Sequence, residues 1–243
     1  DWVIMAINRN QPLDEFITWQ LAGDLLPNAT LEQRVATGFV RMNPSTAEGG
    51  AIPAEFQAKN NFDRVETLGT VFLGMSLTCA RCHTHKYDPI PQVEYYRLFA
   101  FFNSTAESSM DGNKYEYGPV ARAPASIEAW QEWNALASAR KQIVDAADMH
   151  LEKSDDVDPA GKTQWDNATV AARLAMVADA SGLFASLEIH EQAVALEGRR
   201  VETEKAYTTT LVAQDLPAPR TTQVLTRGEY NLPSGDPLAP GIV

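Results

Sequence analysis

Only two cysteines occur among the 243 residues, Cys79 and Cys82, and they lie three positions apart. So few cysteines exclude a disulfide-built scaffold, in which many bridges replace a hydrophobic core. The chain must therefore fold around apolar side chains, and 44% of its residues are hydrophobic. A chain of this length and composition can form one large globular domain or two small ones.

Apolar residues recur at helical spacing through most of the chain. The pattern predicts short helices in the N-terminal third, and a capping box at Thr30–Gln33 is expected to begin one of them. Two further periodic stretches, 56–76 and 91–102, lie on either side of the cysteines. The first part of the chain is therefore predicted to fold as a compact helical domain.

The composition changes after residue 125 to one rich in Ala, Glu, Gln, Lys and Arg. This composition predicts two long helices, 126–152 and 164–205, separated by a polar break and packed as an antiparallel hairpin. Runs of β-branched residues at 207–213 and 221–226 predict strands. We expect a mainly α protein with three parts: a helical domain bearing the cysteines at 1–123, a helical hairpin at 124–206, and the start of a β-containing domain at 207–243, which the chain truncates.

The balance of charges limits the kinds of partner that the chain is expected to bind. Lys and Arg number 20 and Asp and Glu number 32, which gives a net charge of −12. A chain this acidic is repelled by nucleic-acid phosphates, so a nucleic-acid partner is not expected. No apolar run has the length that a membrane span needs.

The two cysteines belong to a single motif, Cys79-Ala80-Arg81-Cys82-His83, which has the C-x-x-C-H pattern of covalent c-type haem attachment. Two thiols one turn apart can bond to the two vinyl groups on one edge of a porphyrin. A histidine directly after the second thiol can then ligate the iron. On this interpretation Cys79 and Cys82 bind haem c covalently and His83 is its axial ligand.

Other chemistries fit the same residues. His85 and Asp88 follow closely, so Cys79, Cys82, His83, His85 and Asp88 could hold zinc or iron in a hydrolase or binding module. A redox-active dithiol and a pair of inert buried thiols are further alternatives. A second haem ligand cannot be chosen among the remaining histidines, His150 and His190, and the methionines near the motif.

The chain resembles a cytochrome-c-like domain of unknown function that is found in large exported proteins of planctomycete type. The resemblance covers residues 2 to about 104, and Thr222–Tyr230 resembles the opening of the domain that usually follows it. The matching blocks are Gln20–Pro27, Ala36–Phe39, Glu48–Gly50, Asp63–Val65, Leu73-Gly74, Cys79–Ile90 and Tyr95-Tyr96.

This resemblance implies an exported, periplasmic or otherwise extracytoplasmic haem domain that is part of a longer chain. Its expected role is electron transfer, or haem-dependent oxidation of an extracellular substrate such as a carbohydrate, so an association with oxidoreductases is expected while enzyme activity stays open. The expected partners are an electron-transfer protein or a polysaccharide. The resemblance also favours a buried Asp63–Arg64 pair that holds a loop or a haem propionate.

Overall fold

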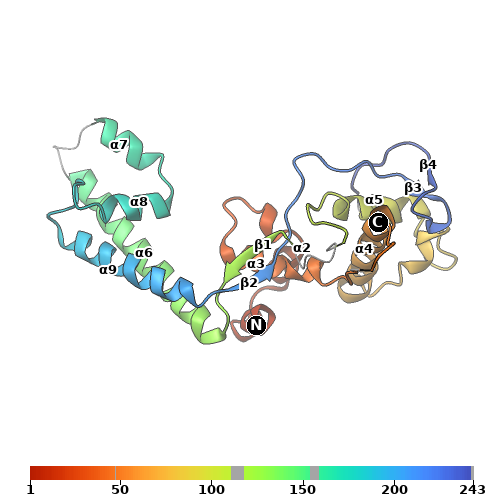
Figure 1. The fold of residues 1–243 in the computed structure, drawn as a ribbon, viewed down its shortest axis with the longest axis horizontal. Coiled ribbons are helices and arrows are strands. Elements are labelled where there is room, and N and C mark those ends of the chain that lie inside the picture. The colour runs from red at the N-terminus through yellow and green to blue at the C-terminus, as the bar shows by residue number, and fades with distance from the viewer. Residues whose placement is uncertain (47, 111–117, 154–158, 242–243) are drawn as a thin grey trace. The chain divides into compact units, whose positions relative to one another are not determined.

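The computed structural model of the chain describes residues 1–46, 48–110, 118–153 and 159–241. Nine α-helices and four short strands lie in these ranges, so the expected mainly α fold is confirmed. Two compact units can be recognised (Figure 1). We call residues 2–121 with 209–243 the motif unit, and residues 122–208 together with Asp1 the hairpin unit.

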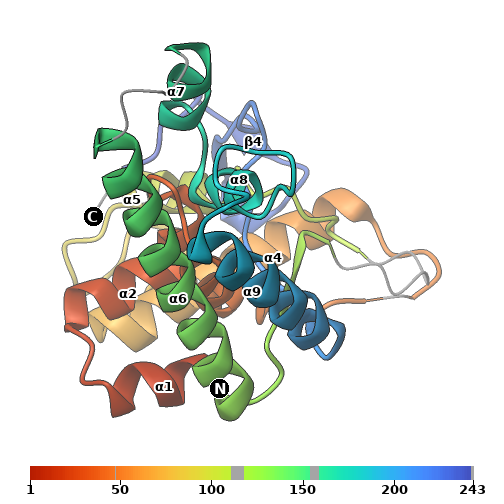
Figure 2. The same cartoon turned by 90° about the vertical axis from the view of Figure 1, so that its left-hand side faces the viewer.

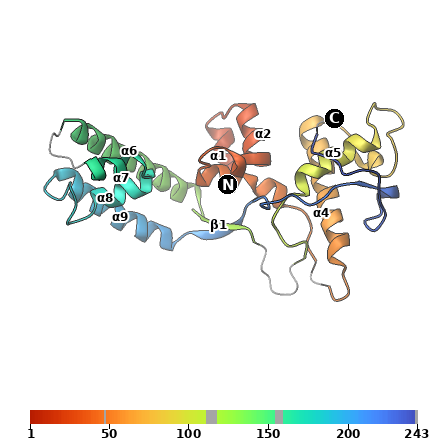
Figure 3. The same ribbon diagram turned by 90° about the horizontal axis from the view of Figure 1, so that it is seen from above.

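The motif unit begins with three short helices, α1 (Trp2–Asn8), α2 (Leu13–Ala22) and α3 (Leu31–Ala36). The capping box predicted for α3 is confirmed. Thr30 Oγ1 accepts from the Gln33 amide at 3.2 Å, and Gln33 Oε1 accepts from the Thr30 amide at 2.8 Å. The rings of Trp2 and Phe16 stack with centroids 5.4 Å apart, which joins α1 to α2, and the two helices lie side by side in Figure 3.

Two longer helices, α4 (Pro53–Leu68) and α5 (Gln92–Phe102), build the main core of this unit. The periodic stretch predicted to run to residue 76 ends earlier, because α4 passes into a wide π-helical turn at Gly69–Leu73. Gly74 then takes a left-handed conformation, with φ of 63°, and its amide donates to Gly69 O. The buried core residues are Val40, Ala58, Phe62, Val65, Leu68, Leu77, Ala80, Ile90, Tyr95, Tyr96, Leu98, Phe99, Phe102 and Ala213.

The chain leaves the motif unit through strand β1 (Val120–Ala123) and returns through β2 (Thr208–Leu211), and the two strands form one small sheet (Figure 1). A second sheet pairs β3 (Val224–Leu225) with β4 (Pro233–Ser234) in antiparallel register, with Val224 opposite Ser234. Both predicted C-terminal strand regions therefore contain a strand, although each strand is shorter than expected.

The hairpin unit has the expected long first helix, α6 (Ile127–Lys153), and the antiparallel α9 (Glu188–Lys205) packs along it (Figure 2). Its own core is formed by these two helices and the segment that connects them, and it centres on Ala147, Trp165, Leu174, Phe184 and Ala193.

The predicted single helix over 164–205 is wrong. The segment instead contains the end of α7 (Pro159–Asp166), then α8 (Val170–Val177), then α9. Thr169 starts α8 as its cap, since its hydroxyl accepts from the Ala172 amide at 3.3 Å. A turn follows α8, in which Asp179 Oδ1 accepts from the Ser181 amide at 2.9 Å. The polar break expected at 153–162 lies partly outside the described residues.

Candidate haem-attachment site

The C-x-x-C-H motif lies on a tight 3₁₀ turn, Thr78–Arg81, between the end of α4 and the start of α5. The amide of Ala80 donates to Leu77 O at 2.9 Å, and the amide of Cys82 donates to Cys79 O at 3.3 Å. Side chains three apart share a face of such a turn. Leu77 and Ala80 are buried in the core, whereas Cys79 and Cys82 are both exposed. The turn therefore leaves both cysteines at the surface, on the same face of the turn.

Two side chains of α5 hold this turn in place. Gln92 Nε2 donates to Arg81 O at 3.0 Å, and the Tyr96 hydroxyl lies 2.9 Å from the same carbonyl oxygen. Tyr96 is also 3.2 Å from Leu225 O, and its single hydroxyl hydrogen can go to one carbonyl at a time. Burial is the main cause that raises the pKa of Tyr96, so it stays a neutral donor.

The C-terminal segment contacts Cys82, which stays exposed. Its thiol donates to Arg227 O, with Sγ 3.2 Å from the oxygen. Gly228, with φ of 75°, follows directly, and a Cβ at this position would lie 3.1 Å from Cys82 Sγ. Only a glycine can take this conformation so close to the sulfur without strain. Sequence reasoning did not place this segment at the motif, because residues 227 and 82 are far apart in the chain.

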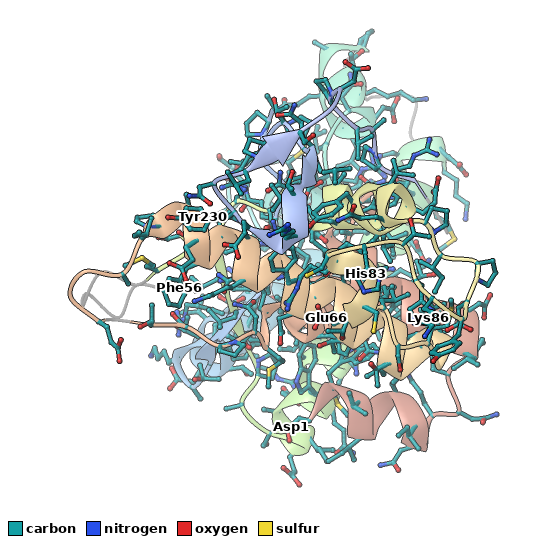
Figure 4. All side chains as sticks on the ribbon, turned by 90° about the vertical axis from the view of Figure 1, so that its right-hand side faces the viewer. Asp1, Phe56, Glu66, His83, Lys86 and Tyr230 are labelled. Atoms are coloured by element: carbon teal, nitrogen blue, oxygen red, sulfur yellow. The ribbon has the colours of Figure 1, made fainter. Side chains whose placement is uncertain are left out.

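The side chain of His83 is exposed, and its position is labelled in Figure 4. Its Nδ1 lies 2.7 Å from Thr84 O. A carbonyl oxygen only accepts, so Nδ1 carries the hydrogen and the lone pair is left on Nε2. A hydrogen bond of this kind from one ring nitrogen to a backbone carbonyl is usual for histidines that bind a metal through the other nitrogen.

His85 has a different position, within the loop that follows. Its side chain is 7% exposed, and its Nδ1 accepts from the amides of Asp88 at 2.8 Å and Tyr87 at 3.3 Å. Asp88 Oδ2 also lies 3.1 Å from this nitrogen, but a lone pair that accepts two amides cannot also donate to a carboxylate. We therefore take the ring to be neutral, with its hydrogen on Nε2 and its Nδ1 closing the loop.

Metal ligation by His83, His85 and Asp88 stays a prediction. Among the residues that the structure describes, no group of three or more His, Cys, Asp or Glu side chains is placed to hold a metal ion. Of the other candidate ligands, His150 and His190 belong to the hairpin unit, and Met75 packs against the core of the motif unit.

Charged and aromatic groups of α4 and α5 surround Arg81 of the motif. Its guanidinium lies over the Phe62 ring, 5.0 Å from the centroid, and 3.4 Å from Glu66 Oε1. Burial alone would lower the pKa of Arg81, but the charge of Glu66 and the neighbouring Cys82 raise it. Arg81 is therefore a permanent positive charge between the two cysteines, and Figure 4 shows Glu66 and His83 on the same face.

Arg64, expected to pair with Asp63, is buried but pairs with Glu107 instead. The Arg64 Nη1 to Glu107 Oε1 distance is 2.5 Å, and the two side chains are 2% and 3% exposed. Arg64 also donates to Val40 O and Asn43 Oδ1, both at 2.8 Å, so it does hold the loop that precedes α4. Burial would raise the pKa of Glu107, but the charge of Arg64 and a hydrogen bond from Thr105 hold it below the usual 4.5.

The fold and the motif define a small helical domain with a surface-exposed C-x-x-C-H turn. Residues 1–107 match the family PSCyt2, described as a protein of unknown function (DUF1549), and this part of the chain belongs to that family of planctomycete cytochrome-like domains. The matched range includes α1 to α5, the motif turn and Glu107. No curated protein and no solved structure matches the chain.

None of the described helices is long and apolar enough to cross a membrane. The boundaries expected for the three parts of the chain, and the assignment of 207–243 to a truncated domain, stay predictions. The structure adds that residues 209–243 pack with residues 2–121 in one compact unit.

Proposed function

We propose that the motif unit binds one c-type haem and acts as a redox domain. The observation that carries this proposal is the motif turn itself. Its two exposed thiols share a face, and the next residue is a histidine whose Nδ1 hydrogen is engaged at 2.7 Å while Nε2 is free. These are the donors that covalent haem attachment needs, so the residues fit the group.

The roles of the residues follow from their contacts. Cys79 and Cys82 would hold the haem through thioether bonds, and His83 would ligate its iron through Nε2. Bound haem supplies reversible one-electron chemistry at its iron. Thr84 O keeps the imidazole of His83 in the ligating tautomer, and Tyr96 and Gln92 hold the turn through Arg81 O.

The exposure of the motif favours electron transfer over oxidation of a bound substrate. Cys79, Cys82 and His83 all lie at the surface, where another protein can approach the attached group. We therefore propose an electron-transfer partner, with a carbohydrate or other extracellular substrate handled elsewhere in the parent chain. The resemblance to exported proteins supports a periplasmic or otherwise extracytoplasmic location, and the proposed thioether attachment of haem is consistent with it.

Visible spectroscopy of the purified chain tests the proposal. The chain is produced with and without a cytochrome c maturation system, alongside a variant that carries Cys79→Ser and Cys82→Ser. We expect a Soret band that survives acid-acetone extraction in the wild type only when the maturation system is present, and no such band in the double variant. Bound zinc with no Soret band would contradict the proposal.

The axial role of His83 needs a separate comparison. His83→Ala should alter the Soret band and either shift the reduction potential of the haem or reduce the yield of haem-loaded protein, because the iron loses its protein ligand. Lys86→Ala is the matched control, since Lys86 is an exposed residue of the same loop. Equal spectra for the wild type and both variants would show that His83 is not a ligand of the iron.

A further inference from the structure

A second site lies in the motif unit, away from the cysteines. It is a cavity of about 670 Å³ between the end of α2, the turn after α4 and the C-terminal end of α5. Its wall is mostly apolar, with Leu68, Met75, Leu98 and Phe102 among the lining residues. This volume lies within the range of small-molecule sites in proteins, which are typically apolar with a few polar groups.

Two carboxyl groups, those of Asp24 and Asp215, interrupt this apolar wall. Asp24 is half-buried and Asp215 is exposed, so the pair marks the side of the cavity that reaches solvent. In the described part of the chain, no Lys, Arg or His nitrogen lies within 4.0 Å of either carboxylate. No close ion pair among the described residues therefore neutralises these two carboxylates, and the charge of Arg34 acts on Asp24 only from a longer distance.

The surroundings of the two carboxyl groups disfavour their charged forms. Burial raises the pKa of Asp24, and only the charge of Arg34 and a backbone hydrogen bond oppose this. Burial also raises the pKa of Asp215, as do the negative charges of Asp24 and Glu107. A positive group placed between the two carboxylates would relieve this repulsion.

We propose that this cavity binds a small amphiphile that has an apolar chain and a primary ammonium head. The apolar chain would replace water along Leu68, Leu98 and Phe102, and the ammonium group would donate hydrogen bonds to Asp24 and Asp215. Charge-assisted hydrogen bonds of this kind are stronger than neutral ones. The complementarity of charge selects a cationic head over an anionic one.

The site is separate from the proposed haem site. Cys79, Cys82 and His83 do not line the cavity. Haem also carries two propionate carboxylates, which the carboxylates of Asp24 and Asp215 would repel. Ligand binding here can therefore be tested in the chain with or without haem.

Calorimetric titration tests the proposal, with decylammonium as the probe and decyl sulfate as the anionic comparison, both below their micelle concentrations. We expect one saturable decylammonium site per chain and at least about tenfold weaker binding of decyl sulfate. Asp215→Asn should weaken decylammonium binding by about tenfold. Asp236→Asn removes the same charge at an exposed position outside the cavity and should leave the affinity unchanged.

A cavity-filling variant separates this site from general attraction to an acidic protein. Ala22→Leu adds bulk to the cavity wall and keeps both carboxylates, so it should abolish decylammonium binding. Circular dichroism verifies that each variant is folded, and Asp24→Asn provides an independent carboxylate variant.

Three outcomes would overturn the proposal. Equal affinity for decylammonium and decyl sulfate would show an apolar cavity without charge selection. Non-saturable binding that Ala22→Leu leaves intact would show only surface attraction. Equal affinity of the wild type, Asp24→Asn and Asp215→Asn for decylammonium would show that neither carboxylate binds the head group.

Discussion

At the scale of single residues, two features of the motif unit leave little room for substitution. Gly23 lies where α2 meets α3, and a Cβ there would overlap the backbone carbonyl oxygen of Gln33 and lie 2.9 Å from its carbonyl carbon. Arg64 and Glu107 form a buried ion pair that also holds Val40 and Asn43. Both features connect segments that are apart in the sequence.

Gly23→Ala should destabilise the motif unit by about 1–3 kcal/mol, because the added methyl group must displace backbone rather than a flexible side chain. Urea denaturation followed by circular dichroism measures the change. Gly49→Ala is the control, since nothing lies within 4 Å of a Cβ built there. Equal loss of stability in both variants would contradict the close approach of the chain at Gly23.

Glu107→Gln should cost about 3–5 kcal/mol of unfolding free energy at pH 7, because it leaves the buried Arg64 charge without its partner. The pKa of Glu107 is lowered in the folded state, so its stabilisation is present above pH 4.5 and is lost as the pH falls through the lower folded value. The variant should therefore lose less stability than the wild type on acidification below pH 4.5.

Glu48→Gln, at an exposed position, is the charge-matched control for this measurement. If Glu107→Gln and Glu48→Gln unfold alike at every pH, the ion pair makes no net contribution to stability.

The partner of Arg64 could not be predicted from the sequence, because nothing in the spacing of residues 64 and 107 relates them. The haem-binding role proposed for Cys79, Cys82 and His83, by contrast, could be inferred from the sequence, because the three residues lie within five consecutive positions.

At the scale of secondary structure, local signals predicted some boundaries and missed others. The capping box at Thr30 determines where α3 begins, and its two hydrogen bonds are purely local. The single helix expected over 164–205 was wrong because alanine-rich periodicity continues across its breaks. The cap residue Thr169 was the local signal that could have located the start of α8.

The motif turn depends on α5, and Tyr96→Phe tests this dependence. Loss of the hydroxyl removes a donor from Arg81 O or Leu225 O, so amide hydrogen exchange at residues 78–83 and 224–226 should become faster. A loss of stability of about 1 kcal/mol is expected for one hydrogen bond. Tyr87→Phe is the matched control, since Tyr87 is 83% exposed, and comparable exchange in the two variants would contradict this role.

At the scale of the whole molecule, the chain forms two units with separate cores. The core around α4 and α5 shares no residue with the core of the hairpin unit. Strands β1 and β2 pair where the chain leaves and re-enters the motif unit. Composition alone predicted the hairpin, but the return of residues 209–243 to the first unit depends on contacts far apart in sequence.

Replacing residues 124–206 with a short Gly-Ser linker should therefore leave the motif unit folded, because β1 and β2 already hold the two ends together. The shortened chain should show one cooperative thermal transition and, after maturation, the same covalent haem content as the full chain. An unfolded shortened chain would show that the hairpin unit is needed for the fold of the motif unit, and a folded one that takes up less haem than the full chain would show that it is needed for haem uptake.

The central claim is that Cys79 and Cys82 carry a covalent haem. Intact mass spectrometry under denaturing conditions tests it most directly, applied to the chain produced with a cytochrome c maturation system. We predict a mass increase of one haem that maps to the peptide containing Cys79–His83 and is absent when both cysteines are replaced by serine. An unmodified mass, in a sample where a known c-type cytochrome is fully loaded, would contradict the claim.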